Sequence, residues 1–272
     1  MFEMIVLGVV QGITEFLPIS SSGHLVLLQR VFGMPETGLL LEILLHVGSL
    51  LAVLTLFFKD WLAMLLHPLS NRTLRLLIVA TIPTVIAAIF FQDFLERAFG
   101  GWFLGVSFLI TAALLTASEN FVSRRAGRQK AGDDLASMQY RQAAAMGVMQ
   151  AVAIVPGISR SGSTIAGGIV SGLSKPTAAH FSFLMSAVAT VGSLVFKLKD
   201  LLGTGGAAFE GGAAALIVGM LASAVSGYLA IRWMLRLIRR VSLKWFAIYT
   251  AILGLLILCD QLFFGMVFER IV

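Results

Sequence analysis

Charge and cysteine are scarce in this chain of 272 residues. Charged residues make up 12% of it, and Cys259 is its one cysteine. A disulfide framework and a cysteine-rich metal site are therefore excluded. What the chain has in abundance is apolar surface: 58% of its residues are hydrophobic, and the mean hydropathy is +0.94. A soluble chain of this length cannot bury so much apolar surface, so the sequence predicts an integral membrane protein.

Six apolar stretches are long enough to cross a bilayer, which takes about 20 helical residues. Two further apolar regions, 1–38 and 140–175, are interrupted by Gly, Pro and Ser clusters. Each of these is predicted to be a pair of short helices around a loop, because Pro and Gly interrupt the helical hydrogen bonds. An all-α fold with six transmembrane helices is expected. The predicted spans are residues 39–58, 74–92, 102–119, 178–197, 212–232 and 245–266.

The net charge of +6 comes from 20 Lys and Arg against 14 Asp and Glu. These cations gather in the loops after the first, third and fifth spans, which the positive-inside rule places in the cytoplasm. No basic and aromatic module for nucleic acid is visible, so the expected electrostatic partner is membrane lipid. With this orientation region 1–38 begins and ends outside, whereas 140–175 begins and ends inside. Two re-entrant hairpins, dipping from opposite faces, are therefore predicted.

An internal repeat supports this topology. The segment GVVQ at 8–11 aligns with GVMQ at 147–150, and ISSSG at 19–23 aligns with ISRSG at 158–162, at an offset of 139 residues. Each half then holds one hairpin and three spans, and an odd number of spans inverts the second copy. We expect a single membrane domain, residues 1–272, with repeat one at about 1–138 and repeat two at about 139–272.

The first broken region carries polar residues that are costly at membrane depth. Gln11 and Glu15 are four residues apart and share a helix face, and a carboxylate there needs a cation, a donor or a wet pocket. Ser21 and His24 are spaced i and i+3 at a helix start, which suits a hydroxyl nucleophile beside a general base. The alternative interpretation of such a serine run is that it only caps and turns the chain.

The second broken region places Arg160 between serines and glycines, flanked by apolar helices. A guanidinium in such surroundings needs an anion, and its planar fork fits a phosphate. The alternative is a loop arginine that reaches the lipid headgroups. The other polar and glycine positions of the two loops are expected to bind phosphate oxygens; they are Gln11, Ser20, Ser22, Gly23, Gln150, Ser159, Ser161, Gly162 and Thr164.

Some features leave alternatives open. Inverted repeats with broken helices are also a common carrier design, so the rival function is a transporter that flips a polyprenyl phosphate with the same anion site. A carrier needs no nucleophile, which makes the Ser21 and His24 pair the discriminating feature. Glu42 and His46, one turn apart, either line the cavity or form an interfacial pair. Small residues such as Gly219 permit close helix packing within one chain or in a homodimer.

The segments QGITEFLPISSSGH (11–24) and PGISRSGST (156–164) resemble the two signature motifs of the bacitracin-resistance type of undecaprenyl-diphosphate phosphatase. The similarity runs over essentially the whole chain. The resemblance implies a multi-pass enzyme of the bacterial inner membrane with an active site open to the periplasm. Such an enzyme hydrolyses undecaprenyl diphosphate to undecaprenyl phosphate and inorganic phosphate, which recycles the lipid carrier for peptidoglycan synthesis and confers bacitracin resistance.

The resemblance also assigns roles position by position. Glu15 matches the essential glutamate of the first motif, and Ser21 and His24 match its proposed nucleophile and partner base. Arg160 matches the phosphate-binding arginine of the second motif. Dependence on a divalent cation, Mg²⁺ or Ca²⁺, is implied as well. Since Gln11 stands where the family uses either Glu or Gln, Glu15 is expected to hold this cation together with water and phosphate oxygens.

Overall fold

The computed structural model describes residues 1–33, 39–91, 103–124, 134–203 and 212–268, and these residues form helices and no strand. The predicted all-α class is confirmed. The helices are α1 (Phe2–Phe16), α2 (Ser21–Val31), α3 (Leu39–Leu56), α4 (Phe58–Leu66), α5 (Arg72–Phe90), α7 (Leu104–Arg124), α8 (Tyr140–Val152), α9 (Arg160–Val170), α10 (Lys175–Gly203), α11 (Gly212–Leu237) and α12 (Lys244–Cys259), which continues into a π-helical turn, η1 (Asp260–Phe264).

Five described helices, namely α5, α7, α10, α11 and α12 with its π-helical turn, are long and apolar enough to cross a membrane. A sixth span is counted if α3 and α4, which bend by 80° at Phe57, are taken together. The six predicted spans correspond to these helices and α3, although the predicted ends at 92 and 102 lie outside the described residues.

Helix α4 was not predicted, because the residues after 58 carry charges typical of a loop. In the structure they form a short amphipathic helix. The helix carries Lys59 and Asp60, but its Met64 is buried and its Trp61 packs against the same apolar cluster. One apolar face is enough to hold a helix of this length against the protein, whatever its charge count.

Both broken regions have the predicted helix–loop–helix structure. At the first break Leu17 is extended, as expected of a residue before proline, and the Ser20 side chain caps α2 by accepting a hydrogen bond from the Gly23 amide at 3.3 Å. At the second break, Ser159 caps α9 by accepting from the Gly162 amide at 3.1 Å. The breaks therefore place the N-termini of two short helices inside the fold.

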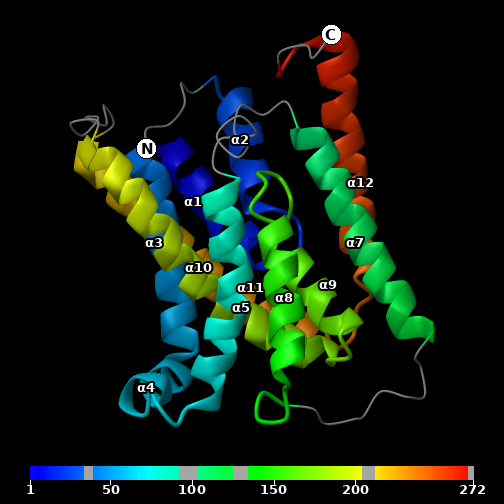
Figure 1. Ribbon diagram of the computed structural model, residues 1–272. Helices are drawn as coiled ribbons and strands as arrows, with labels where there is room; N and C mark the ends of the chain where they lie inside the picture. Colours follow the sequence, from blue (N-terminus) through cyan, green and yellow to red (C-terminus); the bar gives the residue numbers. More distant parts are fainter. Residues whose placement is uncertain (34–38, 92–102, 125–133, 204–211, 269–272) are drawn as a thin grey trace.

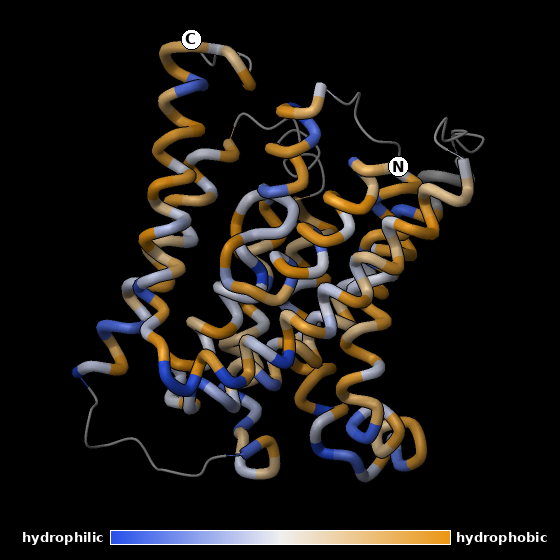
Figure 2. The backbone as a smooth tube through the Cα atoms, turned by 180° about the vertical axis from the view of Figure 1, so that it is seen from behind, coloured by the Kyte–Doolittle hydropathy of each residue, from blue (hydrophilic) through white to orange (hydrophobic). Residues whose placement is uncertain are grey.

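The two halves of the chain pack across each other. Helix α1 packs against α11, and α8 packs against α5 (Figure 1). Helices α7 and α12 run together along one side of the molecule. The N- and C-termini lie at one end, whereas α4 and the start of α8 lie at the other. In Figure 2 apolar residues dominate the long helices and hydrophilic residues gather at the α4 end, which agrees with the grouping of the basic loops.

Two glycines at the repeat offset allow these crossings. A Cβ on Gly8 would lie 2.3 Å from the carbonyl oxygen of Gly219 on α11, and a Cβ on Gly147 would lie 2.2 Å from that of Ala80 on α5. Residues 8 and 147, like residues 80 and 219, are separated by 139 positions. The same backbone approach is therefore made twice, at positions separated by the same offset.

Replacing Gly8 by alanine is expected to lower the free energy of unfolding by about 1–3 kcal/mol, because the added methyl group meets backbone that cannot move aside. Denaturant unfolding of the detergent-solubilised protein measures this. Gly192→Ala on α10 is the control, since a Cβ there meets nothing within 4 Å. Equal stabilities of the two variants would contradict the close crossing.

Candidate active site

The two helix–loop–helix segments meet through a pair of hydrogen bonds. The Ser161 hydroxyl donates to the carbonyl oxygen of Leu17 at 2.8 Å, and the Gly157 amide donates to the Ser22 hydroxyl at 3.3 Å. Ser22 and Ser161 occupy equivalent positions of the repeat. Each loop is therefore held to the other by the serine at its equivalent position, Ser22 in one and Ser161 in the other. The two loops together carry the predicted site residues.

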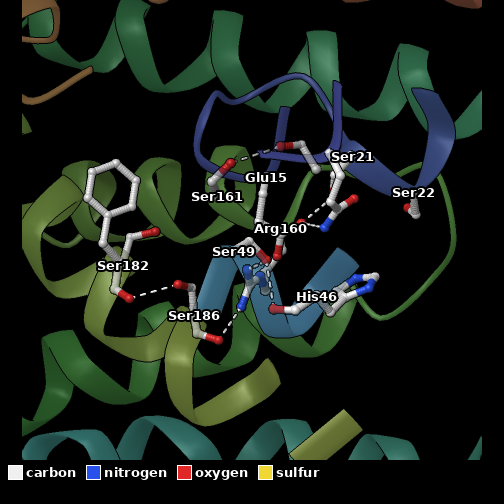
Figure 3. Close-up of polar contacts among 12 residues, drawn as sticks. Glu15, Ser21, Ser22, His46, Ser49, Arg160, Ser161, Ser182 and Ser186 are labelled. Carbon is white, nitrogen blue, oxygen red and sulfur yellow. Dashed lines mark hydrogen bonds and ion pairs between the residues drawn. The ribbon is translucent and has the colours of Figure 1, made fainter. Parts of the chain in front are cut away.

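Glu15 lies at the centre of this junction (Figure 3). It is 8% exposed, and its carboxylate is surrounded by donors. Oε1 pairs with Arg160 Nη2 at 2.5 Å, and Oε2 accepts from the amide of Gln11 at 3.1 Å and from the hydroxyl of Ser21. The guanidinium offsets the cost of burying the carboxylate. The structure therefore brings Glu15, Ser21 and Arg160 together, as the two motifs predict.

Ser21 is the first residue of α2, and its hydroxyl points at a carboxylate. A serine hydroxyl that donates to a buried carboxylate is an arrangement suited to nucleophilic attack, because the acceptor can take the proton. Gln11 lies one helical turn before Glu15 and orients the same oxygen. Glu15 therefore contacts a serine hydroxyl and the Arg160 guanidinium at once, an arrangement that can act as a nucleophile beside a base.

Arg160 is the first residue of α9 and reaches in two directions. Nη1 donates to the carbonyl oxygen of Ser186 on α10 at 2.8 Å, while Nη2 pairs with Glu15. These contacts hold the guanidinium plane, and a guanidinium has five N–H donors in a fixed fork. Ser186 was not among the predicted residues, because a backbone carbonyl as a partner leaves no signal in the sequence.

The predicted pairing of His24 with the Ser21 hydroxyl is not what the structure has. His24 Nδ1 lies 2.6 Å from the carbonyl oxygen of Ser20, and Nε2 lies 2.7 Å from the hydroxyl of Tyr249. A spacing of i and i+3 allows contact, but the ring is turned away by its packing against Phe108 and Tyr249. The Ser21 hydroxyl donates to Glu15 instead. Tyr249, 225 residues away, is a partner that the spacing could not indicate.

The remaining predicted phosphate-binding residues have partners within the protein. Thr164 contacts Ser182 on α10 at 2.6 Å, and the Gln150 amide donates to Thr84 on α5 at 3.1 Å. Ser20 and Ser159 cap helices, which was the alternative interpretation of the serine runs. A Cβ on Gly23 would lie 2.6 Å from Phe108, and one on Gly162 would lie 3.1 Å from Ser159. A role in binding phosphate stays a prediction for all of these residues.

A narrow crevice with no room for a water molecule adjoins Glu15. Helices α3 and α10 line its far wall with the hydroxyls of Ser49, Ser186 and Thr190. Elsewhere on α3, Glu42 pairs with Lys197 at 2.6 Å, and His46 Nδ1 lies 2.8 Å from the Glu42 carbonyl oxygen. The side chain of Glu42 is therefore paired with a lysine of α10 rather than with His46. This hydroxyl-lined wall was not predicted.

The residues present fit a divalent cation of the oxygen-preferring kind. The Oε1 atom of Gln11 is buried and has no hydrogen-bond partner in the described structure, and it belongs to a side chain that touches Glu15. Among the described residues no group of three His, Cys, Asp or Glu side chains could hold a metal. One carboxylate and one amide oxygen suit Mg²⁺, which commonly completes its shell with water and substrate phosphates.

Several known proteins are similar to this chain over nearly its whole length. The chain is 42% identical over 262 residues to an undecaprenyl-diphosphatase of Carboxydothermus hydrogenoformans, which covers 96% of this chain and 97% of that protein. It is 42% identical to undecaprenyl-diphosphatase 4 of Bacillus thuringiensis subsp. konkukian, over 95% of this chain and 96% of that one. An undecaprenyl-diphosphatase of Methanosphaera stadtmanae is 39% identical, and the similar region covers 93% of this chain and 95% of that protein. Residues 4–256 match the model of the family described as bacitracin resistance protein BacA, and the chain belongs to that family.

Proposed function

We propose that this protein is an undecaprenyl-diphosphate phosphatase, which hydrolyses undecaprenyl diphosphate to undecaprenyl phosphate and inorganic phosphate. Its family and its relatives' names support this activity. The observation that carries the proposal is the contact of Glu15 with both Ser21 and Arg160 across two segments far apart in the chain. A carrier needs the positive charge of Arg160 to bind its anionic substrate, but it does not need a serine hydroxyl that donates to a base.

In the proposed reaction Arg160 holds the terminal phosphate with the N–H donors that face it. The Ser21 oxygen attacks the terminal phosphorus, and its proton passes to Glu15. The bond from this phosphorus to the bridging oxygen breaks, and undecaprenyl phosphate leaves. Water then attacks the phosphoserine, which releases inorganic phosphate and restores the Ser21 hydroxyl. The carboxylate serves as the base because it is the acceptor of the Ser21 hydroxyl.

A divalent cation, Mg²⁺ or Ca²⁺, would be held by Glu15 with the unpartnered oxygen of Gln11. When bound, it would neutralise charge on the diphosphate. Chelation of divalent ions is expected to reduce phosphate release, and added Mg²⁺ or Ca²⁺ to restore it; full activity in chelator would contradict this requirement.

The proposed topology has six spans, two re-entrant hairpins and an inverted repeat in one membrane domain, residues 1–272. The cross-packing of α1 on α11 and of α8 on α5 supports the repeat, as do the paired contacts of Gly8 and Gly147. We place the protein in the bacterial inner membrane, with the α4 end, where the described hydrophilic residues gather, in the cytoplasm and the site open to the periplasm. The polyprenyl tail would then lie among apolar helices or lipid.

Phosphate release from undecaprenyl diphosphate by the purified protein is the direct test. Release is expected in buffer that contains divalent ions. Lipid transport in vesicles without any release would favour the carrier instead.

The covalent step is tested separately. In a rapid quench with substrate labelled at the terminal phosphate, label is expected on Ser21, located by peptide mass spectrometry. The Ser21→Ala protein is the control and should carry none. Full turnover by Ser21→Ala would eliminate the covalent route and leave direct attack by water.

A further inference from the structure

Ser20 has a backbone conformation that L-amino acids rarely adopt. Its φ is 73° and its ψ is 99°, and among the described residues it is the one non-glycine residue with positive φ. Such a conformation costs free energy and persists only where the surroundings enforce it. Ser20 directly precedes Ser21, so this backbone angle sets where the Ser21 hydroxyl points.

His24 is the side chain that holds Ser20 in place. The carbonyl oxygen of Ser20 accepts hydrogen bonds from the backbone amide of His24 at 3.3 Å and from its ring Nδ1 at 2.6 Å. Since a carbonyl oxygen can only accept, Nδ1 carries the hydrogen, and Nε2 of the neutral ring is left as an acceptor. The imidazole therefore ties the peptide unit before Ser21 to the first turn of α2.

Tyr249 in turn holds the imidazole. Its hydroxyl donates to His24 Nε2 at 2.7 Å, and the two rings lie nearly parallel, with centroids 5.7 Å apart. Phe108 of α7 contacts the ring of His24 edge-on. Tyr249 lies on α12, which packs along α7, so this pair of helices braces the loop that carries Ser21.

We propose that Tyr249 is a positioning residue for diphosphate hydrolysis: through His24 it keeps Ser20 at positive φ and so keeps the Ser21 hydroxyl on Glu15. The proposal rests on the proposed function. It assigns His24 a task other than removing the Ser21 proton, because both ring nitrogens are engaged by the backbone and the tyrosine.

The first test is Tyr249→Phe, which removes one hydroxyl and keeps the ring. A displaced nucleophile reacts more slowly although the substrate still binds, so kcat is expected to fall about 10- to 100-fold with KM within twofold of the wild type. The control is Tyr228→Phe on α11. It also removes one tyrosine hydroxyl, and it keeps the ring face that contacts Arg232. Loss of the hydroxyl leaves the buried Nε2 of His24 without its donor, so kcat is measured well below the melting temperature of the variant.

The second test separates positioning from base catalysis. The amide nitrogen of His24→Asn can occupy the place of Nδ1 and donate to Ser20, whereas the amide of His24→Gln reaches the place of Nε2 and contacts Tyr249. Positioning predicts that His24→Asn retains at least tenfold more kcat than His24→Gln. It also predicts that adding Tyr249→Phe to His24→Asn has no further effect.

Unchanged kcat in Tyr249→Phe, or equal loss in His24→Asn and His24→Gln, would overturn the positioning role. A wild-type protein that releases no phosphate from undecaprenyl diphosphate would refute the proposed function instead, so the two failures are distinguishable.

Discussion

Replacing Arg160 by methionine is expected to lower phosphate release by at least about 10³-fold, the size of effect seen where an arginine stabilises a phosphoryl-transfer transition state. The change removes the ion pair with Glu15 and the hydrogen bond to the carbonyl oxygen of Ser186, while it keeps a long side chain. Arg160→Lys keeps the charge but cannot span the two partners with one planar group, so it is expected to recover only part of the activity. Steady-state assays on purified, folded protein measure both.

Loss of an ion pair alone could reduce activity by loosening the fold, and the chain offers a matched control. Lys175 pairs with Glu119 at 2.8 Å, with side chains about as buried as those of Arg160 and Glu15. Lys175→Met breaks this pair away from the site, so it should lower stability yet leave the turnover of folded protein within a few-fold of the wild type. If Arg160→Met and Lys175→Met lost turnover to a comparable extent, the proposed role of Arg160 in the reaction would be refuted.

Replacing Glu15 by glutamine is expected to reduce kcat by about 10²- to 10⁴-fold, the usual contribution of a general base. The amide has nearly the shape of the carboxylate but cannot take the proton of Ser21, and it leaves Arg160 without a counter-charge. Phosphoserine formation in a single turnover should slow by the same factor, because the lost group acts in that step.

Glu119→Gln is the matched control for this change. Glu119 is also 8% exposed, and its two oxygens bind Lys175 and the amide of Leu243. Its loss should affect the packing of α7, α10 and α12 but not the chemistry. Normal phosphoserine formation by Glu15→Gln would show that another group accepts the proton.

Much of the fold was predictable because hydropathy and helix breaks are local properties. The helices α5, α7, α10, α11 and α12 lie where long apolar runs occur, and Pro18 and the serine caps mark one break. The helix α4 was not predictable from its charges, because what holds it is the burial of Met64 against other helices. Its bend from α3 depends on packing rather than on composition.

The candidate site was predictable in its residue types and less so in its contacts. Glu15, Ser21 and Arg160 stand out because charge and hydroxyls are costly in an apolar region, and the structure brings them together. The predicted contact of His24 with the Ser21 hydroxyl was wrong. Spacing along one helix says nothing about a tyrosine 225 residues away, which is the partner that His24 has.

The amino-acid sequence was enough to predict a membrane protein, two apolar regions that break at polar loops, and a carboxylate, a serine and an arginine on those loops. The donation from Ser21 to Glu15 and the contact of His24 with Tyr249 became visible in the folded chain alone. Hydropathy and helix termination depend on neighbours in the chain. The direction of a buried polar side chain depends on which helices pack around it, here α7 and α12 from opposite halves of the chain.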